Sequence, residues 1–140
     1  MPVKSMSGNV GGRRAHGRKD ASLPFSNAVR VGPVVAVAGQ GGLDPVSGKR
    51  VDGGIVSELR QIKKNIVNAL AECECTLDDV VRVDIFLADL QDYDRLNSEY
   101  KAWFSEPPPA RTTVRADLLY DLRVEVTVLA IASAGKYSKG

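Results

Sequence analysis

The chain has 140 residues, of which 44% are hydrophobic and 26% charged, a composition typical of one globular domain with its own core. No segment approaches the ~20 consecutive apolar residues of a membrane-spanning helix, and no apolar stretch follows the charged N-terminus, so we expect a cytoplasmic protein without a membrane partner. His16 is the only histidine, which excludes histidine-based catalytic triads and histidine-ligated metals from the rest of the chain. We therefore expect no metal.

The net charge of +2 is unevenly distributed along the chain. Residues 1–20 contain five basic residues and one acidic residue, and residues 21–140 contain the other 14 basic and 16 acidic residues. Residues 1–20 are predicted to form a disordered basic arm, and contact of this arm with nucleic acid or an anionic surface is the alternative. Residues 21–140 are predicted to form a single domain, whose net charge of −2 argues against nucleic acid as a partner.

The first half of the domain predicts a hairpin, a loop and a helix. Two β-prone segments, 27–31 and 34–39, flank a Gly-Pro pair, which is a hairpin signal, and residues 40–48 are rich in turn residues. The cysteines Cys73 and Cys75 are too close for an ordinary disulfide and lack C-x-x-C spacing, so we expect small, partly buried side chains near a helix end. The helix itself is predicted from apolar residues at steps of three and four: Ile55, Leu59, Ile62, Ile66 and Leu70.

The second half predicts a strand, a second helix and two further strands. Residues 80–87 alternate so that the apolar side chains of Val81, Val83, Ile85 and Leu87 share one face. The second helix is predicted to bury Tyr93, Leu96, Tyr100 and Trp103, and it ends before the prolines at 107–109. Strands are predicted at 111–116 and at 122–132, the latter apolar enough to be central in a sheet.

The predicted order of elements is ββαβαββ. One mixed sheet with two helices on one face, an α+β fold, would bury every apolar stripe described above. The opposite face of the sheet would still carry valine, leucine and isoleucine side chains. An uncovered apolar sheet face predicts assembly through that face.

Arg111 is the first candidate functional residue. It follows three consecutive prolines and begins a strand, so its guanidinium is expected on rigid backbone. A planar guanidinium held in this way suits bidentate binding of a carboxylate. The alternative is an ordinary solvated arginine at a strand end.

Glu125 and Gly39 are the other candidates that the residues themselves indicate. Glu125 interrupts an apolar strand, where an ionised carboxylate is unfavourable unless it is paired, and it would come near Arg111 if the two strands were neighbours. A structural ion pair or an exposed strand end is the alternative for Glu125. Gly39 lies at a strand end, where a glycine turn exposes backbone groups to a ligand, and a plain turn is the alternative.

Several segments, taken in order, resemble the RidA/YjgF family of enamine/imine deaminases. They span residues 24–132, nearly the whole chain beyond the arm. Each segment is weakly specific alone, and the ordered set is specific. The segments are Pro24-Phe25-Ser26-Asn27-Ala28-Val29, Val37-Ala38-Gly39-Gln40, Leu43-Asp44-Pro45-Val46-Ser47-Gly48, Gly53-Gly54-Ile55, Asp79-Val80-Val81, Phe86-Leu87-Ala88-Asp89-Leu90, Leu96-Asn97-Ser98-Glu99-Tyr100, Pro109-Ala110-Arg111-Thr112-Thr113-Val114 and Val124-Glu125-Val126.

The resemblance implies a chorismate-mutase-like fold that assembles as a homotrimer with a cleft between each pair of subunits. It further implies cofactor-free hydrolysis of reactive imines and enamines, such as those from 2-aminoacrylate, to 2-oxo acids and ammonia. Arg111 matches the family's carboxylate-binding arginine, and Glu125 matches the acid that orients or activates water. Gly39 matches a position whose backbone lines the cleft.

Two cleft positions depart from the family pattern. Phe25 stands where active members usually have tyrosine, and Thr113 stands where many have cysteine, so substrate range and rate are the properties most affected. The substrate expected from the resemblance is a small imine, enamine or 2-oxo acid. A non-catalytic regulatory trimer that binds small carboxylates in the same cleft is the alternative function.

Overall fold

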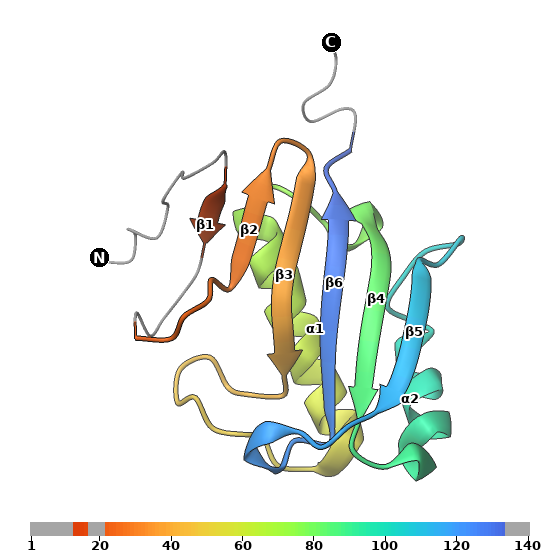
Figure 1. Ribbon diagram of the computed structural model, residues 1–140. Coiled ribbons are helices and arrows are strands. Elements are labelled where there is room, and N and C mark those ends of the chain that lie inside the picture. Colours follow the sequence, from red (N-terminus) through yellow and green to blue (C-terminus); the bar gives the residue numbers. More distant parts are fainter. Residues whose placement is uncertain (1–12, 17–21, 134–140) are drawn as a thin grey trace.

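The computed structural model describes residues 13–16 and 22–133. Six strands form one sheet in the order β1-β2-β3-β6-β4-β5, in which only the β4–β5 pair is parallel (Figure 1). Two helices, α1 (Gly54–Glu72) and α2 (Tyr93–Tyr100), lie behind one face of this sheet. The strands are β1 (Arg14–His16), β2 (Ala28–Val31), β3 (Val34–Gly41), β4 (Val80–Leu87), β5 (Ala110–Arg115) and β6 (Val124–Ile131). The predicted α+β fold with one mixed sheet and two helices is confirmed.

The core lies between the helices and the sheet. The predicted apolar stripe of α1 is fully buried, with every member at most 3% exposed. Burying an aliphatic side chain of this size contributes about 1.5–3 kcal/mol, so this stripe is a main source of the stability that fixes α1 on the sheet. On the sheet side the core residues are Val83, Ile85, Leu87, Val124, Val126, Val128 and Ala130. Cys73 and Cys75 are fully buried rather than partly buried as expected, and burial raises the pKa of the Cys73 thiol to about 11.

Three expectations require correction. Arg14–His16, assigned to a disordered arm, instead forms strand β1 beside β2; the rest of segment 1–20, apart from Arg13, lies outside the described residues. Val81 is 46% exposed, because a register shift between Val80 and Arg82 makes Val80 the buried residue. Tyr93 is 43% exposed and is not part of the core.

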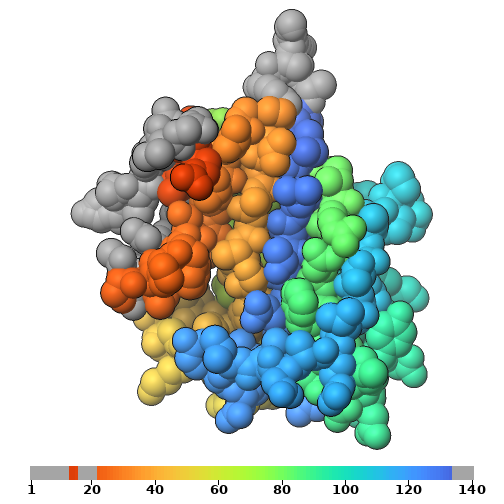
Figure 2. All heavy atoms as spheres, in the orientation of Figure 1, coloured from red at the N-terminus to blue at the C-terminus, as the bar shows by residue number. Residues whose placement is uncertain are grey.

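The opposite face of the sheet carries no helix among the described residues. β2, β3, β6 and β4 are visible across this open sheet face in Figure 2. Partly exposed aliphatic side chains occur along its strands, including Val31, Val34, Val114 and Ile131. The described residues contain no helix that combines the length and the apolar character needed to cross a bilayer.

Candidate active site

Arg111 lies on the edge strand β5 with its side chain directed toward α2. Its Nη2 donates to Asn97 Oδ1 at 2.8 Å and to Tyr93 Oη at 3.4 Å. Its Cζ is 4.8 Å from the centroid of the Tyr100 ring, which is cation–π geometry, and 5.7 Å from that of Tyr93. The three α2 residues follow one another at helical spacings of four and three, so one stripe of the helix holds the guanidinium.

The charge of Arg111 has no acidic partner in the described part of the chain. Every group that holds its guanidinium is neutral: an amide oxygen, a phenol and an aromatic face. The described residues also offer no acceptor to Nε or Nη1. These two nitrogens carry three N–H groups beside a full positive charge, so they can donate to an anion.

Thr113 lies two residues further along β5, on the same face as Arg111. Its Oγ1 is buried without a hydrogen-bond partner, and so is the Oη of Tyr100. Burial raises the pKa of Tyr100 to about 12, so its phenol stays protonated at neutral pH. Leaving a buried hydroxyl without a hydrogen bond costs about 1–3 kcal/mol of stability. Two such hydroxyls, those of Thr113 and Tyr100, therefore distinguish the surroundings of Arg111 from an ordinary core.

Glu125 and Gly39 form a second group of candidate residues. Glu125 is opposite Gly41 in β3 and Phe86 in β4, and it lies on the open sheet face. A Cβ atom at Gly39 would overlap Glu125 Oε2, so the carboxylate lies directly against the Gly39 backbone. The sequence predicted both residues but gave no reason to place them in contact. A register shift between Val37 and Gln40 in β3 produces this approach.

The two groups are not brought together within one chain. β4 lies between β5 and β6, so the condition that the strands of Arg111 and Glu125 be neighbours is not met. Alternation along the strands also places the two side chains on opposite faces, because Arg111 is opposite the buried Val83 and Glu125 is opposite Phe86. Phe25 lies in the turn before β2 and is 53% exposed.

The sequence analysis missed Glu58, a carboxylate on the buried face of α1. Glu58 is 1% exposed, and its Oε1 accepts a hydrogen bond from the backbone N–H of Arg123 at 2.8 Å. Burial raises the pKa of Glu58, and the backbone N–H groups of Arg123 and Val124 partly oppose this shift. The available signal was its position, three residues after Ile55 and four before Ile62 on an otherwise apolar stripe.

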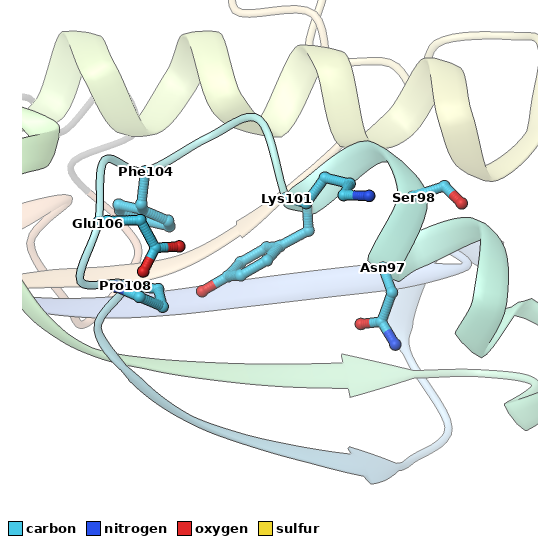
Figure 3. Close-up of a pocket in the computed structure, with 7 residues that line it drawn as sticks. Asn97, Ser98, Lys101, Phe104, Glu106 and Pro108 are labelled. Carbon is cyan, nitrogen blue, oxygen red and sulfur yellow. The ribbon is translucent and has the colours of Figure 1, made fainter.

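Two surface clefts lie near these groups. The larger, about 390 Å³, is formed by the end of α2 and the segment leading to β5, and it shares Asn97 and Tyr100 with the Arg111 environment (Figure 3). The smaller, about 320 Å³, is lined by residues around Asp92 and Arg123 at the start of β6. Neither of these clefts is lined by Arg111 or Glu125. Among the described residues, no cluster of His, Cys, Asp and Glu is suited to a metal ion.

Comparisons with known proteins agree with this architecture. The family model described as Endoribonuclease L-PSP matches residues 16–132. The 2-iminobutanoate/2-iminopropanoate deaminase of Mus musculus is 38% identical over 109 residues, covering 77% of this chain and 81% of the mouse protein.

Two solved structures are similar over most of the chain. A putative endoribonuclease from Thermotoga maritima superposes with a TM-score of 0.77 at 31% identity, covering 81% of this chain and 90% of that one. RidA from an Antarctic Psychrobacter gives a TM-score of 0.75 at 33% identity, covering 80% and 91%. The fold and the matched residues define an α+β protein with one mixed sheet and two helices on one face. The chain belongs to the RidA/YjgF family, as its ordered segments indicated.

Proposed function

We propose that this protein hydrolyses 2-imino acids and their enamine tautomers, such as those derived from 2-aminoacrylate, to 2-oxo acids and ammonia without a cofactor. The observation that carries the proposal is the state of Arg111: a guanidinium held by neutral partners, with Nε and Nη1 offered no acceptor by the described residues. Such a group favours a small carboxylate ligand. The name of the mouse relative, a 2-iminobutanoate/2-iminopropanoate deaminase, supports the same substrate class.

The proposed reaction needs an anchored substrate and one activated water. Arg111 binds the substrate carboxylate through the guanidinium N–H groups that α2 leaves free, which fixes the adjacent imine carbon. The Glu125 carboxylate takes one proton from the water it holds as the water oxygen attacks that carbon, and it delivers this proton to the imine nitrogen to give a carbinolamine. Glu125 then takes the hydroxyl proton of the carbinolamine and passes it to the amino group, which leaves as ammonia while the C=O bond of the 2-oxo acid forms.

The separation of Arg111 and Glu125 leads to the proposal that two copies of the chain share each site. One copy contributes Arg111 and Thr113 from its edge strand β5, and the next contributes Gly39 and Glu125 from its open sheet face. A homotrimer closed through the open sheet face would contain three such clefts. The valine and isoleucine side chains exposed on that face support this assembly, because the contact between copies would bury them.

The remaining cleft positions tune the proposed activity. Phe25 supplies an apolar wall in place of a hydroxyl, and Thr113 supplies a hydroxyl near the anchored carboxylate. The acidic balance of residues 21–140 does not favour a phosphate backbone as ligand, although the family description includes the word endoribonuclease. We therefore propose the deaminase activity and treat RNA cleavage as an outcome to be measured.

The test is the rate of ammonia and 2-oxo acid formation from freshly generated 2-iminobutanoate. Wild type should accelerate both, and Arg111→Ala should lower kcat/KM at least 100-fold, because two hydrogen bonds to charged groups contribute about 3–6 kcal/mol. Arg115→Ala is the matched control, an exposed arginine on the same strand, and should retain the activity. Equal rates for wild type and Arg111→Ala would overturn the proposal. Binding of a 2-oxo acid without turnover would identify a carboxylate-binding trimer instead.

A further inference from the structure

A buried carboxylate on α1 has no part in the reaction described above. Glu58 is 1% exposed on the stripe that otherwise packs Ile55, Leu59 and Ile62 against the sheet. Burying an ionisable group is unfavourable unless it is paired or hydrogen-bonded, so a leucine would serve the core better than this glutamate. The contacts of Glu58 show what it does instead.

Glu58 fixes the start of β6 from the helix side. Its carboxylate accepts the backbone N–H of Arg123 at 2.8 Å, and the backbone N–H of Val124 is close enough to lower the pKa of the same carboxyl. The carbonyl of Arg123 accepts from the N–H of Ala88 at 3.0 Å, and its guanidinium bonds Asp92 Oδ2 at 2.9 Å. The residue is thus held through its N–H, its carbonyl and its side chain. Glu125 follows two positions later.

The same part of α1 also holds the end of β3. A Cβ atom at Gly42 would lie 2.7 Å from both the Cα and the Cβ of Glu58, so the turn after β3 is in close contact with the helix there. Two turns further along α1, Asn65 Nδ2 donates to the carbonyls of Gly41 at 3.3 Å and Leu43 at 3.1 Å. One helix face therefore fixes both strand ends that bring Gly39 and Glu125 together.

We propose that Glu58 is a positioning residue that sets the placement of the Glu125 carboxylate against Gly39. This inference rests on the proposed function, in which Glu125 holds the attacking water. A carboxylate suits the task because both of its oxygens can accept, from the N–H of Arg123 and from that of Val124 beside it, whereas a glutamine would direct its amide N–H toward one of them. The charged groups facing Glu58 are Arg50 and Arg123.

The experiment compares matched variants of two buried acids. Glu58→Leu removes both acceptors, and Glu58→Gln retains one. Asp79→Leu and Asp79→Asn are the controls, because Asp79 is also buried and accepts a backbone N–H, that of Thr76, at a site remote from Glu125. The readouts are kcat and KM for 2-iminobutanoate, and amide hydrogen exchange across 123–125.

We expect Glu58→Leu to lower kcat about 10- to 100-fold, because displacing the Glu125 carboxylate by about 1 Å has an effect of this size. KM should change less than about twofold, because the groups around Arg111 that bind the substrate are unaltered. Glu58→Gln should lower kcat about threefold, and both variants should speed amide exchange at Val124 and Glu125. The Asp79 variants should leave kcat and this exchange as in wild type, whatever they do to stability.

Three outcomes would overturn the positioning role. Glu58→Leu could change kcat no more than Asp79→Leu does. It could instead raise KM and leave kcat unchanged. If Glu58→Leu does not fold, a Glu58→Gln variant with wild-type kcat and wild-type amide exchange would also overturn the positioning role. If the wild-type protein has no deaminase activity, the proposed function is refuted but the positioning role of Glu58 is not. Amide exchange at Val124 and Glu125, compared between wild type and the Glu58 variants, then decides whether Glu58 fixes this segment.

Discussion

Subunit mixing tests whether each site takes Arg111 from one copy and Glu125 from another. Within one chain the two side chains lie on opposite faces of the sheet and are separated by β4. Arg111→Ala and Glu125→Gln subunits should each be nearly inactive alone. In a ring of three copies, equal amounts of the two variants pair an intact Arg111 with an intact Glu125 in about one quarter of the clefts. The mixture should therefore regain about a quarter of wild-type activity.

A second mixture supplies the control. Wild type combined with the double variant Arg111→Ala/Glu125→Gln should also retain about one quarter of the activity if each cleft is shared, and about one half if each chain has a complete site. Ammonia release from 2-iminobutanoate measures the activity, and native mass spectrometry measures the fraction of mixed assemblies. Mixed trimers with no recovery in the first mixture, and about one half in the second, would refute the shared site.

Three further predictions concern Gly39, Asn97 and Glu58. Gly39→Ala should lower the free energy of unfolding by about 1–3 kcal/mol, because the added Cβ overlaps the Glu125 carboxylate, and Gly39→Ala/Glu125→Ala should recover most of this loss in denaturant titrations. Asn97→Asp should raise KM more than Asn97→Ala does, because a carboxylate at this position pairs with Arg111 and competes with the substrate; equal KM values would contradict this. Burial raises the folded-state pKa of Glu58 above its ordinary value of 4.5. As the pH falls from neutral through that raised pKa, the free energy of unfolding of wild type should therefore increase relative to that of Glu58→Gln. A difference in unfolding free energy that stays constant across this pH range would contradict the prediction.

The fold could be predicted largely because its main elements have regular periods. The stripe of α1 and the alternation in β4 and β6 each bury one face, and these patterns fix the type and order of the elements. One error in the predicted burial occurs where a single extra residue shifts the two-residue alternation of a strand. A register shift at Val80 reverses which neighbouring valine is buried, and no pattern in the sequence marks it. β1 was missed because Arg14–His16 is short and polar and forms a strand only through pairing with β2.

The sequence indicates the candidate residues but not their arrangement. Arg111 and Glu125 have sequence signals: a proline run before a strand and a charge within an apolar strand. Their placement on opposite sheet faces depends on β4 lying between their strands, which is long-range topology. The Asn97 contact had no signal either, because a polar residue on a helix is ordinarily read as solvated.

A comparison of two arginines shows why Arg111 suits a ligand. Arg123 is neutralised by Asp92, which is 3% exposed and receives two of its N–H groups, so that guanidinium has a structural role. Arg111 is held with similar rigidity by the Asn97 amide and the Tyr100 ring, neither of which carries a charge. A neutral environment fixes the orientation of a cation and leaves its attraction for an anion uncompensated. The same residue type therefore stabilises the fold at one position and remains available for a carboxylate at the other.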